Sequence, residues 1–142
     1  MNIFTEAPKL EEQNCPFAMA QIVDSRGSTP RHSAQMLVRA DGSIVGTIGG
    51  GMVERKVIEE SLQALQERKP RLFHGRMARN GADAVGSDCG GAMSVFISVH
   101  GMRPRLVLIG AGHVNRAIAQ SAALLGFDIA VADIYRESLN PE

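Results

Sequence analysis

Hydrophobic and polar positions follow two different periods along the chain, and these periods predict its helices and strands. A helical period over residues 2–12 and 52–66 predicts two amphipathic helices. Continuous or alternating apolar positions predict strands over residues 17–23, 35–40, 43–48, 71–74 and 92–99. Asp41-Gly42, between the second and third of these strands, is a strong signal for a hairpin turn. This part of the chain therefore predicts a small α/β domain.

The pattern changes after residues 100–104, which are typical of a linker. An apolar strand over residues 105–109, a glycine turn, a helix over residues 113–125 and an apolar strand over residues 127–132 follow. This order predicts the opening βαβ unit of a Rossmann-like fold. A doubly wound sheet needs further strands, so we expect this unit to be truncated and the chain to be a fragment of a longer protein. The expected domains are residues 1–102 and 103–142.

Composition and charge exclude several classes of function. The 142 residues are 44% hydrophobic and 21% charged, which is typical of a globular protein. The 15 basic and 15 acidic residues give a net charge of +0, and 4% of residues are aromatic, so we expect no binding to nucleic acid or to a membrane. The two cysteines form no disulfide framework and residues 1–13 lack a signal-peptide core, so we expect a reducing cytoplasm.

Three consecutive glycines, Gly49, Gly50 and Gly51, stand directly before the second predicted helix. Their backbone N–H groups are free to point at one place, and a helix N-terminus attracts phosphate. Glu54, in the first turn, complements the helix dipole and is placed to orient part of a ligand. The sequence thus indicates a phosphate or pyrophosphate site, with a plain strand-to-helix turn as the alternative.

Two polar segments carry further candidate chemistry. Arg31 ends a segment of hydroxyl, glycine and arginine residues and suits bidentate recognition of phosphate, although a solvated turn also explains that segment. Cys89 is followed by Gly90 and Gly91 at the end of a segment expected to be an exposed loop. Such a thiolate is placed to ligate a metal or to accept and pass on sulfur. The alternative is a small buried residue that precedes a strand, and Cys15 is expected to be structural.

The glycine turn of the second domain is similar to a dinucleotide-binding motif, with one departure. Gly110 and Gly112 follow a strand and precede a helix, and Asp133 ends the next strand near the spacing of a ribose-binding carboxylate. His113 either caps the helix or faces a ligand. Asn115 stands where the third glycine of the motif allows close packing, so a nucleotide at this unit is left open.

Four motifs occur in this chain in a recognisable order. They are Gly27-Ser28-Thr29-Pro30-Arg31, Gly49-Gly50-Gly51-Met52-Val53-Glu54, Cys89-Gly90-Gly91 and Gly110-Ala111-Gly112-His113-Val114. In this order they resemble the XdhC/CoxI family, accessory proteins for molybdenum hydroxylases such as xanthine dehydrogenase and carbon monoxide dehydrogenase. More narrowly, the chain looks like the member linked to selenium-dependent molybdenum hydroxylases in enterobacteria.

The resemblance implies an N-terminal domain with the first three motifs and a C-terminal Rossmann domain. It also implies a maturation factor that binds molybdenum cofactor (molybdopterin), protects it during sulfuration and passes it to an apo-hydroxylase. A sulfur donor such as a cysteine desulfurase is the second implied partner. In that setting Gly49, Gly50, Gly51 and Arg31 hold the phosphate of the cofactor, and Cys89 contacts molybdenum or handles sulfur or selenium. Glu54, Gly90 and Gly91 are further expected cofactor-binding residues.

The residues leave more than one class of function open. The sequence shows no Ser/His/Asp or paired-carboxylate arrangement, which favours a cofactor-binding chaperone over an enzyme that turns over by itself. An NAD(P)-dependent oxidoreductase that uses Gly110, Gly112 and Asp133 is the alternative. A third interpretation is an assembly module that binds a hydroxylase subunit without any cofactor. Exposed edge strands of an incomplete sheet also predict a homodimer.

Overall fold

The structure is a computed structural model that describes residues 2–27, 34–76, 81, 84 and 91–139. Its internal contacts divide the chain into two compact units, Met1–Met102 and Arg103–Glu142. Helices and strands occur in both units, and this confirms the predicted α/β class.

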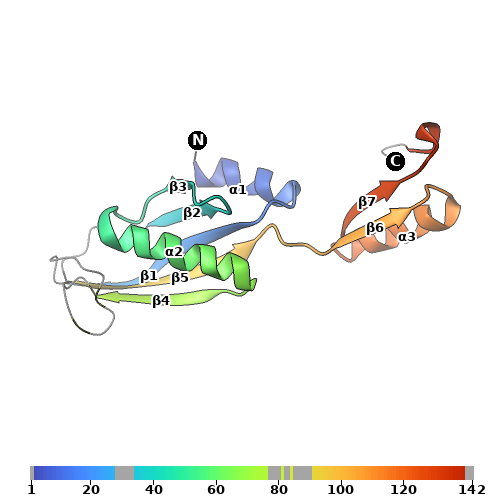
Figure 1. Ribbon diagram of the computed structural model, residues 1–142. Helices are drawn as coiled ribbons and strands as arrows, with labels where there is room; N and C mark the ends of the chain where they lie inside the picture. The colour runs from blue at the N-terminus through green and yellow to red at the C-terminus, as the bar shows by residue number, and fades with distance from the viewer. Residues whose placement is uncertain (1, 28–33, 77–80, 82–83, 85–90, 140–142) are drawn as a thin grey trace. The chain divides into compact units, whose positions relative to one another are not determined.

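The described part of the first unit contains five strands and two helices. In chain order these are α1 (Ile3–Glu12), β1 (Phe17–Arg26), β2 (Gln35–Arg39), β3 (Ile44–Gly46), α2 (Gly51–Glu67), β4 (Arg71–Arg76) and β5 (Ala92–His100). The strands form one sheet in the order β3-β2-β1-β5-β4, and every neighbouring pair is antiparallel. β1 therefore lies at the centre of the sheet, between β2 and β5 (Figure 1).

The alternation of side chains along the central strand β1 reverses at a β-bulge. As far as Ile22, alternate residues of β1 point to the face that α2 covers. Beyond Ile22 the register shifts, so that Asp24 lies opposite Ser94 of β5. Val23 is the extra residue, and it is 54% exposed. Because one additional residue reverses the alternation of side chains, Asp24 and Arg26 point to the sheet face opposite α2.

Helix α2 covers one face of the sheet with an apolar stripe (Figure 1). Burial of this stripe, rather than helix propensity alone, stabilises α2. The central strand presents Ala18 and Ala20 to it, and these small side chains let the helix approach closely. The buried residues of this core are Ala18, Ala20, Ile22, Met36, Val38, Ile48, Val53, Val57, Ala64, Leu65, Met93, Val95 and Ile97.

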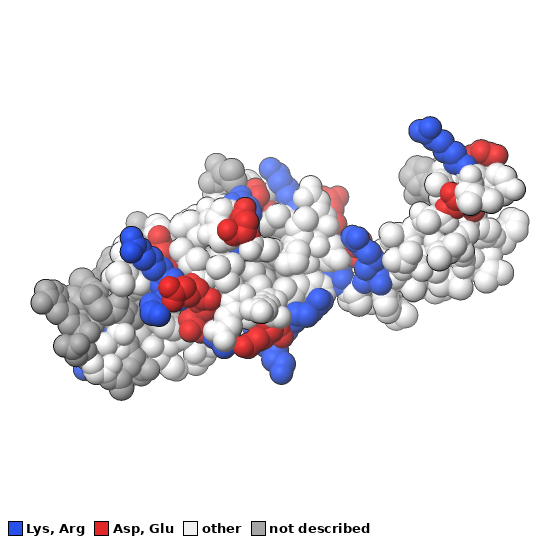
Figure 2. All heavy atoms as spheres, in the orientation of Figure 1, with Lys and Arg blue, Asp and Glu red and all other residues white. Residues whose placement is uncertain are grey.

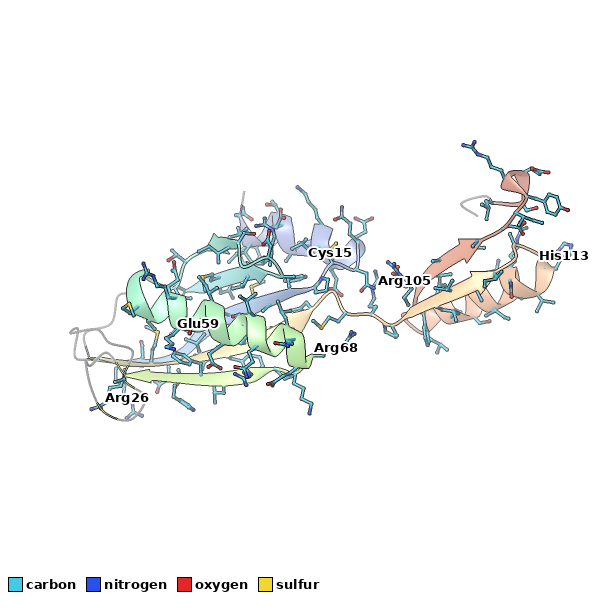
Figure 3. The ribbon with its side chains drawn as sticks, in the orientation of Figure 1. Cys15, Arg26, Glu59, Arg68, Arg105 and His113 are labelled. Carbon is cyan, nitrogen blue, oxygen red and sulfur yellow. The ribbon has the colours of Figure 1, made fainter. Side chains whose placement is uncertain are left out.

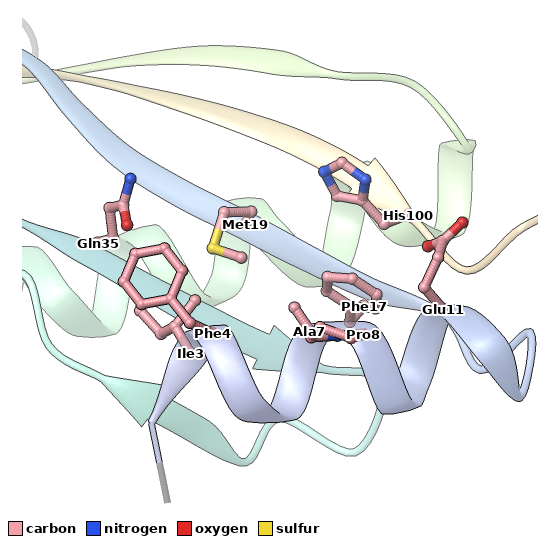
Figure 4. A pocket seen from close by; sticks show the side chains of 9 residues that line it. All are labelled: Ile3, Phe4, Ala7, Pro8, Glu11, Phe17, Met19, Gln35 and His100. Atoms are coloured by element: carbon pink, nitrogen blue, oxygen red, sulfur yellow. The ribbon is translucent and has the colours of Figure 1, made fainter.

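Helix α1 packs on the opposite face, over β2 and β3. It begins at a capping box formed by Asn2 and Thr5. Its buried cluster consists of Ile3, Phe17, Leu37 and Val45. A hollow of about 380 Å³ lies beside α1, where the ring of Phe17 stacks on His100 (Figure 4). Farther along this face, Leu72 of β4 and Phe96 of β5 are exposed.

The described part of the second unit is one βαβ unit followed by a 3₁₀ turn at Arg136–Ser138. Strands β6 (Arg105–Ile109) and β7 (Asp128–Ala132) run parallel, and α3 (His113–Leu124) connects them (Figure 1). Parallel strands are normally covered on both faces. Here Val107, Ile109 and Ile134 are 59%, 84% and 88% exposed. This unit by itself therefore leaves much of its apolar surface uncovered.

Most of the predicted elements are confirmed, although some of their ends differ. Helices and strands occur at each predicted place within the described residues. β1 ends at Arg26 instead of residue 23, because the bulge keeps it paired with β5. β3 is shorter than predicted and ends at Gly46, since Thr47 and Ile48 already belong to the turn before α2. The predicted exposed loop, 78–91, lies mostly outside the described residues.

The surface of the described residues carries charges of both signs. On the face shown in Figure 2, acidic and basic side chains are interspersed. One ion pair joins Arg71 of β4 to Glu60 of α2, and another joins Lys56 to Glu59 within α2. None of the described helices is both long enough and apolar enough to cross a membrane.

We predict that Gly101→Ala destabilises the first unit by about 2–4 kcal/mol, from a left-handed alanine and a steric clash together. Gly101 has a φ of +65°, and a Cβ there would lie 2.0 Å from the carbonyl oxygen of Cys15. Gly42→Ala is the control, because Gly42 has a φ of +84° but a Cβ there would meet only Leu62 Cδ1, at 3.8 Å. It should cost about 1 kcal/mol. Urea denaturation measures both changes, and equal losses of stability would contradict this account.

Candidate functional site

The strand register gathers three of the four motif regions at one end of the five-stranded sheet. Arg26 at the end of β1 and Arg76 at the end of β4 both lie opposite Ala92, the first residue of β5. β2 begins and β3 ends on the same side, where Gly46 pairs with Met36. The turn into α2 follows directly. The neighbours of all three motifs therefore lie at this end, which we call the motif end of the sheet (Figure 1).

Three predicted site residues, Arg31, Cys89 and Gly90, lie outside the described residues. The described residues nearest to them in sequence lie at the motif end. Ala34 accepts a hydrogen bond from the N–H of Ile22 at 3.1 Å, and Ala84 forms a bridge with Arg76. Gly91 is buried directly before β5, and its predicted cofactor-binding role stays a prediction.

The three glycines at the start of α2 adopt backbone conformations that favour glycine. Gly49, Gly50 and Gly51 have φ values of 129°, 77° and 70°. Residues with side chains rarely adopt such angles. A Cβ at Gly50 or Gly51 would meet no atom of the described residues within 4 Å, so these two glycines border open space in the described part of the chain. The turn therefore exposes its backbone at the motif end, as a ligand-binding turn requires.

The carboxylate of Glu54 closes this glycine turn from within. Its Oε2 accepts hydrogen bonds from Thr47 Oγ1, from the N–H of Ile48 at 3.2 Å and from the N–H of Gly50 at 3.0 Å. Thr47 Oγ1 in turn accepts from the N–H of Gly49 at 3.0 Å. Of the three glycine N–H groups that the sequence suggested for phosphate, that of Gly50 thus binds an internal anion and that of Gly49 binds a hydroxyl. The phosphate role of these glycines stays a prediction, and any phosphate there has to share these donors with Glu54.

The motif end also has a polar hollow of about 400 Å³ on the sheet face opposite α2. Its polar lining comes from Asp24 and Arg26 of β1, His74 and Arg76 of β4, and Ser94 of β5. The sequence showed Arg26 in a polar segment but gave no reason to connect it with His74. The connection depends on the bulge in β1 and on the pairing of β4 with β5, and neither has a clear signal in the sequence.

A metal centre is not formed by the described residues alone. Among them, no three His, Cys, Asp or Glu side chains come close enough together to hold a metal ion. Cys15, which is described, lies in the turn between α1 and β1, where its Sγ is 3.8 Å from the carbonyl oxygen of Gln13. This turn precedes the start of β1, at the end of the sheet opposite the motif end.

The glycine turn of the second unit is also closed by side chains of the chain itself. Asp133 Oδ2 accepts from the N–H of Ala111 at 2.7 Å, and its Oδ1 accepts from the N–H of Tyr135 at 2.8 Å. Asn115 Nδ2 donates to the carbonyl oxygens of Ile109 and Gly110 at 2.9 and 2.8 Å. The hydrogen bonds from Tyr135 and Ala111 hold the pKa of Asp133 below its ordinary value of 3.8.

The other predicted residues of this turn lie beside it. Gly110 has a φ of 100°, and Gly112 is the N-cap of α3 without a side-chain hydrogen bond. His113 is exposed at the first position of α3 (Figure 3). A hollow of about 310 Å³ borders the turn and is lined by residues of α3 and β7. Nucleotide binding at this turn stays a prediction, and a ligand there competes with Asp133 for the N–H of Ala111.

Comparison with known proteins adds one relative and one solved structure of similar fold. Over 142 residues the chain is 99% identical to the uncharacterized protein YqeB of Escherichia coli (strain K12). The match covers 100% of the chain and 26% of that protein, so the chain spans about a quarter of the relative's length. A crystal structure described as that of a xanthine dehydrogenase from Bacillus halodurans matches with a TM-score of 0.55 and 17% identity. The match covers 99% of this chain and 65% of the chain in that crystal structure, and it supports the fold.

A family comparison tests the resemblance that the motifs suggested. The sequence model of the XdhC and CoxI family matches residues 10–75. This range runs from the end of α1 through most of β4 and contains the motifs at residues 27–31 and 49–54. The suggested resemblance is therefore confirmed over this range: residues 10–75 of the chain match the sequence model of the XdhC and CoxI family.

Proposed function

We propose that this chain is the cofactor-binding part of an accessory protein for a molybdenum hydroxylase such as xanthine dehydrogenase. In this proposal it binds molybdenum cofactor, assists its sulfuration and passes it to the apo-enzyme. The family match over residues 10–75 supports an accessory role. The observation that carries the proposal is the gathering of three motif regions at one end of the sheet.

The described residues at the motif end fit a large ligand. Open space borders Gly50 and Gly51, and the first-turn N–H groups of α2 have no acceptors within the helix. A bound molybdenum cofactor would supply the metal centre that the hydroxylase uses. We propose that Gly49–Gly51 and Arg31 contact the cofactor, that Glu54 keeps the turn in shape, and that Cys89 approaches the metal or takes part in handling sulfur.

Two protein partners follow from this role. The apo-hydroxylase receives the cofactor, and a sulfur donor such as a cysteine desulfurase provides its terminal sulfur. A second copy of the chain is a further partner that we propose, because β6 and β7 are both edge strands of their two-stranded sheet in the described part of the second unit.

An NAD(P)-dependent oxidoreductase is the alternative that the second unit suggests. Its support is the order β6, glycine turn, α3 and β7, which ends at Asp133. A dinucleotide needs the N–H groups of the turn for its pyrophosphate and a free carboxylate for its ribose. Both carboxylate oxygens of Asp133 instead accept hydrogen bonds from the N–H groups of Ala111 and Tyr135. We therefore place the cofactor at the motif end of the first unit.

We predict that Cys89→Ala lowers the retention of molybdenum cofactor roughly tenfold or more, because groups around a metal contribute strongly to its affinity. The full-length protein is mixed with released cofactor and desalted, and bound pterin and molybdenum are then measured. Cys15→Ala is the matched control, since Cys15 lies in the α1–β1 turn away from the motif end. Equal retention by both variants would rule out the role proposed for Cys89.

We predict that Glu54→Gln destabilises the first unit by about 1–2 kcal/mol, because one oxygen of Glu54 accepts three hydrogen bonds in a partly buried turn. Cofactor retention should fall with it as the glycine turn loosens. Glu59→Gln, on the outer side of the same helix (Figure 3), removes only an exposed ion pair with Lys56 at 3.0 Å. It should change stability by less than about 0.5 kcal/mol. Urea denaturation that gives the same loss for both variants would contradict this role of Glu54.

We predict that the carboxyl group of Asp133 titrates with a pKa below 3.8, because the N–H groups of Tyr135 and Ala111 bind its ionised form. A lowered pKa means that this carboxylate stabilises the fold above its ordinary pKa and that the contribution is lost as the pH falls through the lower folded-state value. NMR titration measures the carboxyl, and the amide signal of Ala111 should follow the same midpoint. In Asp133→Asn that amide should lose this transition, and a midpoint at or above 3.8 would be inconsistent with the turn as described.

A further inference from the structure

Two rows of polar side chains cross three adjacent strands at the motif end, on the sheet face opposite α2. In the first row Asp24, Ser94 and His74 stand side by side on β1, β5 and β4. In the second row Arg26 and Arg76 stand on either side of Ala92. Residues that face each other across antiparallel strands point to the same side of the sheet. All six residues therefore line one hollow, with a volume of about 400 Å³.

The β-bulge at Val23 brings Asp24 and Arg26 to the sheet face on which His74 lies. Without the extra residue, Asp24 and Arg26 would continue the alternation of Ile22 and point into the core beneath α2. With it, both point outward, to the side of His74. In Figure 3, Arg26 lies at the end of the sheet where β1, β4 and β5 meet. The bulge thus turns the end of a core strand into one wall of a polar hollow.

The spacing of the two arginines suits a tetrahedral anion. Three adjacent strands place the backbones of Arg26 and Arg76 roughly 10 Å apart. The methyl group of Ala92 between them leaves room above the sheet. The guanidinium of Arg76 packs over Gly81, where a Cβ would lie 2.0 Å from Arg76 Nη2. The side chain of Arg26 is 82% exposed and is therefore free to move toward a ligand.

The other polar side chains of the hollow, His74, Ser94 and Asp24, supply further hydrogen-bonding groups, among them one carboxylate. His74 Nδ1 and Ser94 Oγ are 2.9 Å apart, so this pair is held in place beside the arginines. Asp24 Oδ2 lies 3.6 Å from Arg26 Nε and partly neutralises the positive charge of Arg26. Among the described residues that line the hollow, Arg26, Arg76 and His74 are basic and Asp24 is a carboxylate. A ligand that fits has an anionic group for the arginines and an N–H or O–H group for Asp24.

We propose that this hollow is a binding site for a phosphate monoester, with Arg26 and Arg76 as the residues that hold the phosphate group. It differs from the glycine turn before α2, where Glu54 already accepts the N–H groups of Ile48 and Gly50. The identity of the monoester as the phosphate end of molybdenum cofactor rests on the proposed function. Binding of inorganic phosphate does not depend on it.

The test is a calorimetric titration of the full-length protein with inorganic phosphate at constant ionic strength. We expect one saturable site, and Arg26→Gln and Arg76→Gln should each weaken it by about 10- to 100-fold, the range for charge-assisted hydrogen bonds. Gly81→Ala should also weaken binding, because it displaces the guanidinium of Arg76 without removing a charge. Lys69→Gln, a matched loss of one positive charge between α2 and β4, should stay within about twofold of the unchanged protein.

Each result decides between the two claims. Loss of phosphate binding together with loss of cofactor retention in the arginine variants supports the cofactor as the source of the phosphate group. Loss of phosphate binding with unchanged cofactor retention supports a site for free phosphate. If the unchanged protein retains no cofactor but binds phosphate as described, the proposed function fails and this site stands. No saturable phosphate binding, or binding that only Gly50→Ala weakens, would overturn the proposal.

Discussion

The register of the central strand pair, β1 with β5, is the constraint on which the rest of the first unit depends. It directs Ala18 and Ala20 toward α2, and their small side chains let that helix pack closely. It also brings Arg26 opposite Ala92, and β4 then adds Arg76 to the same position. One register therefore determines both the core and the place where the motif regions meet. A slip by one residue would expose the core face and separate these regions.

The two glycine turns of this chain are stabilised by the same kind of interaction. In each turn, backbone N–H groups near a helix N-terminus are bound by a carboxylate that comes later in the chain: Glu54 in the first unit and Asp133 in the second. An internal anion of this kind stabilises a turn whose donors would otherwise need water or a ligand. Glycine-rich turns before helices are therefore weak evidence for phosphate unless the later carboxylates are also taken into account. In this chain the arginines at the ends of β1 and β4 are therefore better candidates for a phosphate site than the glycines.

Much of the fold was predictable from the sequence, because the helical and strand periods are strong and Asp41-Gly42 marks the hairpin. The bulge at Val23 was not, since a single extra residue leaves the apolar run 17–23 unchanged and only pairing with β5 reveals it. The glycine turn before α2 was predicted at its place, but the three hydrogen bonds to Glu54 depend on how the chain bends at Thr47. That distant residues such as Arg26 and His74 line one hollow depends on the strand order, which local patterns do not contain.

The central claim is that the motif end of the first unit holds the cofactor. The most direct test is anomalous X-ray scattering at the molybdenum edge from crystals of the full-length protein grown with the cofactor. The account predicts a single molybdenum peak beside the N-terminus of α2, at the end of the sheet where Arg26, Arg76 and Ala92 lie. A peak at the glycine turn between β6 and α3, or in the turn between α1 and β1, would contradict it.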